Sequence, residues 1–334
     1  MDRPIVIAPS RRARVALGAI VGIGLLVLTL SRVDLAVVAD RIAAASLPGL
    51  GFAVLIVFVD LAVRGLRWRT LLHGLGVGAP VSLARAVAYL TIGYLANLLL
   101  PARLGDLARA YLAGTAFQRS RLATLGTVVV ERLADGLTML GLAVLASLLV
   151  TGIATVQALA GYGLLVVAAA AGALVLAWWI VTRTAAGESS PGRRVREVAG
   201  RLAAGTAALR TPRGATIVVV TTLAGAATAV TVAWSVAGSL GIALSPVEAT
   251  LFMSAIALSL AIPAAPGSLG TYEFVGVVVL TSLGHGADQA LATIVVMRAV
   301  STLPPIALGI VATWMLHLRP RVILQAAGEE GTPP

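Results

Sequence analysis

Apolar runs of about 20 residues recur along nearly the whole chain, and they constrain its fold more than any other feature. A helix of that length spans the hydrocarbon core of a bilayer. Hydrophobic residues fill 59% of the 334 positions and charged residues only 12%, a balance typical of membrane proteins. The sequence therefore predicts one all-α, polytopic helical membrane domain over residues 1–334, with no separate soluble domain.

About six full spans and two broken re-entrant hairpins account for the apolar runs. The first run has no small-residue cleavage site and is followed directly by Arg32 and Asp34, so we expect it to remain as a span. A short amphipathic helix is expected at 32–46. The predicted full spans are 15–31, 47–65, 122–150, 157–182, 214–240 and 288–317, and the predicted hairpins are 82–118 and 246–284.

The formal net charge is +11, and arginine supplies it. Arginine is enriched in cytoplasmic loops, which explains this charge better than nucleic-acid binding does. Residues 183–213 are expected to form a cytoplasmic basic loop with an amphipathic helix near 193–209, and residues 318–334 a polar tail. We expect a multi-pass protein of the cell membrane with both termini in the cytoplasm. The arginine clusters that would then face the cytoplasm are 3–14, 64–69 (an interfacial anchor with Trp68), 119–121, 183–213 and 319–321.

Two prolines and two glycines interrupt the apolar sequence between 263 and 273. Such a break is tolerated in a bilayer only where protein or a polar cavity surrounds it. The Pro-x-x-Leu-Gly pattern that ends at Gly270 also ends at Gly105, 165 residues earlier. A second echo relates 127–132 to 293–298, 166 residues apart. The sequence thus predicts an internal duplication, with repeats at 15–150 and 157–317.

The predicted topology makes the two repeats inverted, because one hairpin enters from the cytoplasm and the other from outside. Transporters commonly place their substrate between inverted repeats, at broken helices near the midplane. The glycines and prolines of the breaks are then candidate gates. These residues are Pro101, Gly105, Pro263, Pro266, Gly267 and Gly270.

Charged residues inside spans are costly and need a reason. The duplication makes Arg132 and Arg298 equivalent, each about 15 Å into its span at 1.5 Å per residue. Such arginines could bind a lipid phosphate through two parallel hydrogen bonds. The candidate substrate-binding residues are Arg103, Asp106, Arg109, Glu131, Arg132, Asp135, Glu273 and Arg298.

A structural explanation stays open beside this one. Arg132 could pair with Asp135, three residues on, or with Glu131, and Arg298 could pair with Glu273. The two explanations are compatible, since an ion pair can open to admit a substrate. Glu131 or Glu273 could also take up a proton for coupling.

Enzyme and metal chemistry find no support in the sequence. There are no cysteines and three widely separated histidines, so no metal-ligand spacing occurs. Nucleotide-binding glycine loops and nucleophile elbows are likewise missing. We predict no catalytic residue, no metal and no cofactor.

Three ordered motifs carry a resemblance that covers nearly the whole chain. Asn97–Arg109, Glu131–Asp135 and Pro263–Glu273 resemble the lysylphosphatidylglycerol synthase membrane-domain family, also called flippase-like. Asp106 stands where the family pattern leads us to expect a glutamate. The resemblance implies lipid binding or flipping. Because no aminoacyltransferase domain is expected, it does not imply the synthase activity.

The favoured function is therefore translocation of an anionic or phosphate-bearing membrane lipid across the cytoplasmic membrane. One alternative is a non-catalytic subunit that scaffolds a membrane or cytoplasmic partner enzyme acting on lipids or glycans. Another is a membrane-embedded transferase with Asp106 or Glu273 as its base.

Overall fold

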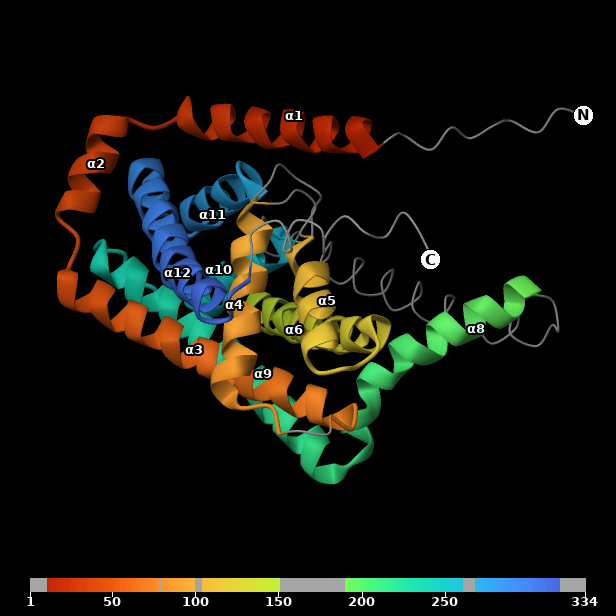
Figure 1. The fold of residues 1–334 in the computed structure, drawn as a ribbon. Helices are drawn as coiled ribbons and strands as arrows, with labels where there is room; N and C mark the ends of the chain where they lie inside the picture. The colour runs from red at the N-terminus through yellow and green to blue at the C-terminus, as the bar shows by residue number, and fades with distance from the viewer. Residues whose placement is uncertain (1–10, 78–79, 100–103, 151–189, 261–267, 319–334) are drawn as a thin grey trace, which may run out of the picture.

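The computed structural model describes residues 11–77, 80–99, 104–150, 190–260 and 268–318. Within these ranges every regular element is a helix and no strand occurs, which confirms the all-α prediction (Figure 1). An apolar sequence favours helices, because a backbone in lipid must satisfy its own hydrogen bonds and a helix does so within one segment. The predicted span 157–182 and the polar tail beyond residue 318 lie outside the described residues.

The chain begins with two helices joined at a sharp bend. α1 (Arg11–Leu30) and α2 (Leu35–Ala43) meet at an angle of 82°. Asp34 ends the connection, and its side chain accepts a hydrogen bond from the N–H of Ala36, which caps α2. The Asp34 N–H donates to Asp288 Oδ1 at 2.8 Å, so the bend is fastened to the start of α12.

Two sets of four helices follow one another in the same order. The first set is α3 (Leu47–Gly74), α4 (Leu83–Leu99), α5 (Gly105–Ala116) and α6 (Arg121–Leu149). The second is α9 (Pro212–Ser239), α10 (Pro246–Ser259), α11 (Thr271–Ser282) and α12 (Ala287–Met315). α3 and α9 both have 28 residues, α5 and α11 both have 12, and α6 and α12 both have 29.

The packing of the two sets is reciprocal. α3 lies along α9 (Figure 1). α4 packs against α12 from the other set, and α10 packs against α6 in the corresponding way. Within each set the short helix pairs, α4 with α5 and α10 with α11, are in contact. These pairs lie where the broken hairpins are predicted, although the breaks themselves, 100–103 and 261–267, are outside the described residues.

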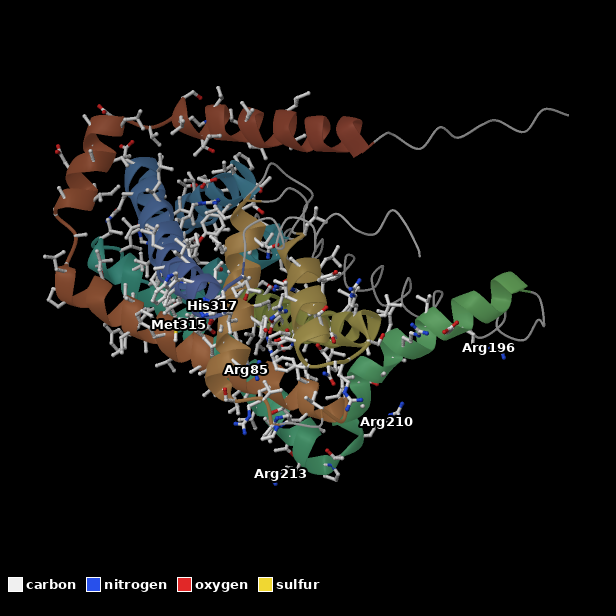
Figure 2. All side chains as sticks on the ribbon, viewed as in Figure 1. Arg85, Arg196, Arg210, Arg213, Met315 and His317 are labelled. Carbon is white, nitrogen blue, oxygen red and sulfur yellow. The ribbon has the colours of Figure 1, made fainter. Side chains whose placement is uncertain are left out.

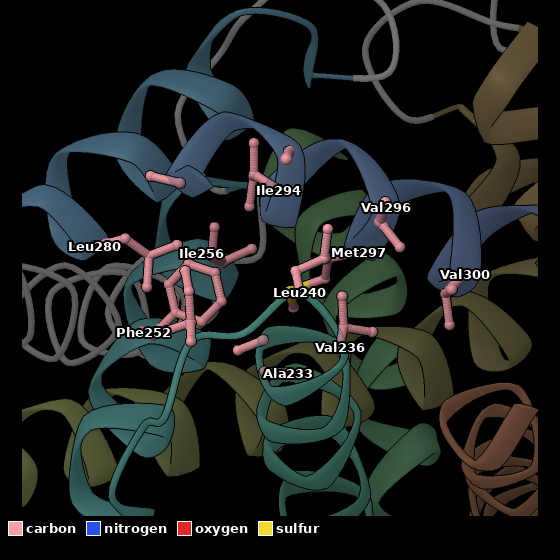
Figure 3. Packing of buried hydrophobic residues seen from close by; sticks show 14 of the residues in the cluster. Ala233, Val236, Leu240, Phe252, Ile256, Leu280, Ile294, Val296, Met297 and Val300 are labelled. Atoms are coloured by element: carbon pink, nitrogen blue, oxygen red, sulfur yellow. The ribbon is translucent and has the colours of Figure 1, made fainter. Parts of the chain in front are cut away.

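The main hydrophobic core forms where the second set meets α2 and α3. Figure 3 shows side chains of α9 to α12 interlocking there, with Phe252 and Ile256 facing Ile294 and Met297. Phe252, Ile256 and Ile294 are fully buried. Close packing of such branched and aromatic side chains fixes the helices at their crossing points.

Among the described residues, three helices are long and apolar enough to cross a membrane, namely α3, α9 and α12. The bent α1–α2 pair brings the number to four if it counts as one span. These helices agree with a polytopic helical membrane protein. The number of full spans, six, stays a prediction. α3 runs to Gly74, beyond the predicted end of its span at residue 65.

The predicted basic segment 183–213 contains α8 (Ser190–Ala203) and the 3-10 helix η2 (Ala204–Arg210). Figure 2 places Arg196, Arg210 and Arg213 on the outer edge of this region, where each is exposed. The segment packs closely against α6 at Gly126. A Cβ added to Gly126 would lie only 2.1 Å from the Leu202 carbonyl oxygen. The expected amphipathic helix near 193–209 is thus divided between α8 and η2.

Candidate functional site

One face of α3 carries three charged side chains. Asp60, Arg64 and Arg67 are spaced four and three residues apart, so they project from the same side. Arg64 Nε donates to Asp60 Oδ2 at 2.6 Å. Asp60 Oδ1 accepts a hydrogen bond from the Thr228 hydroxyl at 2.8 Å, which ties this face to α9.

Asp135 on α6 receives the guanidinium groups of α3. Arg67 donates to it through Nη1 at 2.6 Å and through Nη2 at 3.0 Å. Arg64 Nη1 adds a third hydrogen bond at 3.1 Å. These charge-assisted hydrogen bonds fasten α6 to α3.

A deeply buried ion pair joins Arg109 of α5 to Glu131 of α6. Arg109 Nη2 donates to Glu131 Oε2 at 2.8 Å, and the two side chains are only 2% and 4% exposed. Arg67 Nε lies 3.6 Å from Glu131 Oε1. The Arg109 guanidinium stacks 4.5 Å from the ring centre of Trp68, whose Nε1 donates to Thr127.

Arg109 keeps two donors unused. Its Nε and Nη1 atoms are buried and have no hydrogen-bond partner among the described residues. Leaving buried donors of a charged group unpaired is costly, so such donors point to a missing acceptor. Arg109 also lines a small cavity. The other residues that line it are Arg64, Arg67, Leu90, Tyr94, Glu131, Arg132 and Asp135.

Arg132 closes the outer side of this cluster. It donates to Asp106 through Nε at 2.9 Å and Nη2 at 2.7 Å, and its side chain is 41% exposed. The sequence suggested Asp135 or Glu131, both on the same helix, as the partner of Arg132. In the structure its partner is instead Asp106 on α5. We call the whole set the arginine cluster. It comprises Asp60, Arg64, Arg67, Asp106, Arg109, Glu131, Arg132 and Asp135.

Arg298 occupies a second, separate cluster on α11 and α12. Its Nε lies 2.7 Å from Glu273 Oε1, as the pairing hypothesis predicted. It also donates to the Ser268 carbonyl at 3.3 Å and stacks 4.3 Å from the Tyr272 ring centre. Glu273 Oε2 accepts the N–H of Gly270 at 2.7 Å and so caps α11.

The structure therefore groups the predicted residues unevenly. Asp106, Arg109, Glu131, Arg132 and Asp135 meet in one cluster, while Glu273 and Arg298 form the other. The sequence suggested that Arg132 and Arg298 together bind one phosphate. In the structure they belong to different ion-pair clusters. Arg103 and the break residues Pro101, Pro263, Pro266 and Gly267 lie outside the described residues.

Two of the break glycines are described, and both are needed at close contacts. A Cβ on Gly105 would lie 2.2 Å from the Gly93 carbonyl oxygen, and the Gly105 N–H donates to Asn97 Oδ1 at 2.8 Å. These contacts hold α5 against α4. Gly270 has a φ of +85°, and a Cβ there would lie 1.8 Å from the Gly22 carbonyl oxygen. Both glycines thus let backbones approach closely.

The sequence interpretation missed Asp60, Arg64 and Arg67 as members of the site. It assigned 64–69 to an interfacial anchor, which is wrong for Arg67 and Trp68, because these side chains are 2% and 0% exposed. The signal that could have found them is the spacing of three charges on one face of an apolar helix. Among the described residues, no group of three or more potential metal ligands occurs.

Comparison with known families agrees with the motif resemblance. No curated protein matches the chain. The family described as the lysylphosphatidylglycerol synthase TM region matches residues 15–309, which covers every member of both clusters. The family match and the apolar helices together identify a multi-pass membrane protein. The chain belongs to the lysylphosphatidylglycerol synthase TM region family.

Proposed function

We propose that this protein binds an anionic or phosphate-bearing lipid headgroup in the cavity of the arginine cluster and moves it across the cytoplasmic membrane. The observation that carries the proposal is Arg109 beside that cavity, because its buried Nε and Nη1 have no hydrogen-bond partner in the part of the chain that the structure describes. Guanidinium donors arranged in this way match the oxygens of a phosphate. The stack on Trp68 holds the Arg109 plane in place.

The cavity offers a phosphate several donors from three helices. Arg64 and Arg67 come from α3, Arg109 from α5 and Arg132 from α6. Arg132 is partly exposed, so it is the member that an arriving headgroup meets first. Its pair with Asp106 then serves as the outer closure of the site.

The arrangement of the helices supports movement as well as binding. The two helix sets match in order and length, start 163–166 residues apart, and pack reciprocally. This supports a duplication, and the predicted topology makes the repeats inverted, an arrangement that suits alternating access. In this proposal the glycine and proline residues of the two breaks are the hinges. The Arg298–Glu273 pair on α11 and α12 is the counterpart of Arg132–Asp106.

A lipid-scrambling assay tests the proposal. Purified protein is placed in liposomes that contain headgroup-labelled phosphatidylglycerol, phosphatidylethanolamine or a polyprenyl phosphate, and leaflet exposure is followed over time. The proposal expects movement of a phosphate-bearing lipid by the wild type. Loss of movement is expected in Arg109→Gln, with partial loss in Arg109→Lys, because lysine offers a point charge and no planar fork.

The same assay includes Arg132→Ala and Arg298→Ala, with folding verified by thermal unfolding. Arg196→Gln is the matched control, because Arg196 lies on the outer edge of α8 (Figure 2). If folded protein moves no lipid, the proposal fails, and the scaffold or transferase alternatives take its place. Copurification with a partner enzyme would favour the scaffold. Turnover of a lipid-linked substrate that Glu273→Gln abolishes would favour the transferase.

A further inference from the structure

The arginine cluster is formally neutral, and this has a consequence for any anion that enters it. Its cations are Arg64, Arg67, Arg109 and Arg132, and its anions are Asp60, Asp106, Glu131 and Asp135. A phosphodiester adds one negative charge that no cation of the cluster balances. An unbalanced charge in a buried site is costly. The cluster must therefore lose a negative charge or gain a positive one when the headgroup binds.

The four carboxylates are not equally well stabilised. Asp135 accepts three hydrogen bonds from two arginines. Asp106 accepts two from Arg132, and Asp60 accepts one from Arg64 and one from Thr228. Glu131 accepts one, from Arg109 Nη2, and its side chain is the least exposed at 4%, against 19–23% for the other three.

Glu131 is also the carboxylate that is hydrogen-bonded to the arginine whose other donors await a ligand. Among the described residues, its one hydrogen-bond donor is Arg109, whose Nε and Nη1 have no partner there. A phosphate bound to those groups therefore brings its negative charge next to Glu131. Two negative charges held side by side in a buried site repel each other, and a proton added to one of them removes that repulsion.

The groups around Glu131 come from several helices. α3 supplies Arg67 at 3.6 Å and α5 supplies Arg109 at 2.8 Å, while α4 lines the same cavity with the Tyr94 side chain. α9 supplies the uncharged hydroxyl of Thr222, which binds Arg67. The remaining charged groups of the cluster near it are Arg64, Asp106, Arg132 and Asp135.

We infer that binding of an anionic headgroup is coupled to protonation of Glu131. This rests on the proposed function, because it assigns the coupling of the same site. One proton from solution adds to a carboxylate oxygen of Glu131, and the bound phosphate replaces the lost negative charge. The other oxygen still accepts from Arg109 Nη2. The cluster has the same net charge before and after, and the lipid crosses together with a proton.

The first measurement uses the unmodified protein in detergent with phosphatidylglycerol as the probe. Binding is titrated between pH 6 and pH 8, where the phosphodiester stays ionised. If one proton is taken up with each lipid, the affinity strengthens about tenfold for each unit by which the pH falls. Titrations in two buffers of different ionisation enthalpy count the protons directly, and the expected count is one per lipid.

Glu131→Gln identifies the group. Glutamine resembles the protonated acid and keeps an acceptor for Arg109, so the variant should bind phosphatidylglycerol with an affinity that no longer changes with pH. Proton uptake should disappear. The matched control is Glu248→Gln, because Glu248 caps α10 outside the cluster. It should keep the pH dependence of the wild type. Because Glu131→Gln retains all three histidines, loss of proton uptake in that variant also separates Glu131 from them.

The outcomes distinguish this inference from the proposed function. Binding or transport of phosphatidylglycerol without proton uptake overturns the coupling and leaves the transport proposal standing. Proton uptake that survives in Glu131→Gln also overturns it, because the proton then resides elsewhere. If the folded wild type neither binds nor moves any phosphate-bearing lipid, both fail. Because the proton count uses the wild type, the coupling is tested even if Glu131→Gln does not fold.

Discussion

Arg132 on α6 binds Asp106 on α5 through two hydrogen bonds of 2.9 and 2.7 Å. Arg298 and Glu273 form the same kind of pair between α12 and α11, at 2.7 Å. Each arginine is the twelfth residue of a 29-residue helix, and each acid lies in the first turn of a 12-residue helix that follows a break. In both helix sets, an equivalent ion pair thus helps to fasten the helix after the break to the next helix.

The two pairs differ in burial, and this predicts different contributions to stability. Glu273 is 7% exposed and Arg298 25%, whereas Asp106 is 19% exposed and Arg132 41%. Asp106→Asn should therefore cost about 1 kcal/mol, as for an exposed pair. Glu273→Gln should cost more, on the order of 3 kcal/mol, because it leaves a more deeply buried arginine without its carboxylate.

Thermal unfolding in one detergent measures both variants. Asp106→Glu is the control for the first pair, since it keeps the charge and should stay within a few tenths of a kcal/mol of the wild type. An equal loss for Asp106→Asn and Glu273→Gln would show that burial does not set the contribution of these pairs.

Local sequence patterns predicted the helices well, because an apolar run in lipid has few other options. The equivalence of Arg132 and Arg298 was also visible, since the duplicated motif keeps their spacing. Their partners were harder. Spacing along one helix suggested Asp135 for Arg132, but the close approach of α5 to α6 brings Asp106 nearer. Tertiary packing decides which candidate is nearer, and the spacing of residues in one sequence does not show how two helices pack.

Arg67 and Trp68 show a second limit. Basic and aromatic residues at the end of an apolar run are typical of a membrane interface. α3 continues to Gly74, so these residues lie well inside the helix and face its neighbours. Composition alone does not tell an interfacial anchor from a buried ion-pair cluster. The presence of Asp60 on the same helix face favours the cluster.

Trp68 should stabilise the site in two separable ways. Its ring stacks on Arg109, and its Nε1 donates to Thr127. Trp68→Phe keeps a ring for the guanidinium and loses the hydrogen bond, which should cost about 1 kcal/mol or more with the smaller ring volume. Trp68→Leu also loses the stack and should cost a further 1 to 2 kcal/mol. Thermal unfolding that ranks the two variants in the opposite order would contradict the stacking role.

Gly270 should be among the least replaceable glycines of the described chain. Its φ is +85°, and an added Cβ would lie 1.8 Å from the Gly22 carbonyl oxygen of α1. Gly270→Ala should cost at least about 1 to 3 kcal/mol from backbone strain alone. Gly136→Ala is the matched control, because among the described residues no atom beyond its own helix backbone lies within 4 Å of its added Cβ. Alanine within a helix should leave the stability equal or higher by up to about 1 kcal/mol.

Arg67 should be the most costly member of the arginine cluster to remove. Its side chain is 2% exposed and binds Asp135 through two hydrogen bonds and Thr222 through a third. Arg67→Ala should cost about 3 to 5 kcal/mol, since it removes two of the three arginine hydrogen bonds to Asp135 and one of the two cations beside buried Glu131. Arg196→Ala, at the outer edge of α8 (Figure 2), should stay within about 0.5 kcal/mol of the wild type.

A double-mutant cycle with Asp135→Ala separates the pair from the rest of the site. Removing both partners takes away the unpaired charge, so the double variant should be more stable than the sum of the single losses predicts, by about 1 kcal/mol or more. Losses that simply add would show that Arg67 and Asp135 do not stabilise each other. If the double variant folds well but no longer binds phosphatidylglycerol, the arginine serves the ligand as well as the fold.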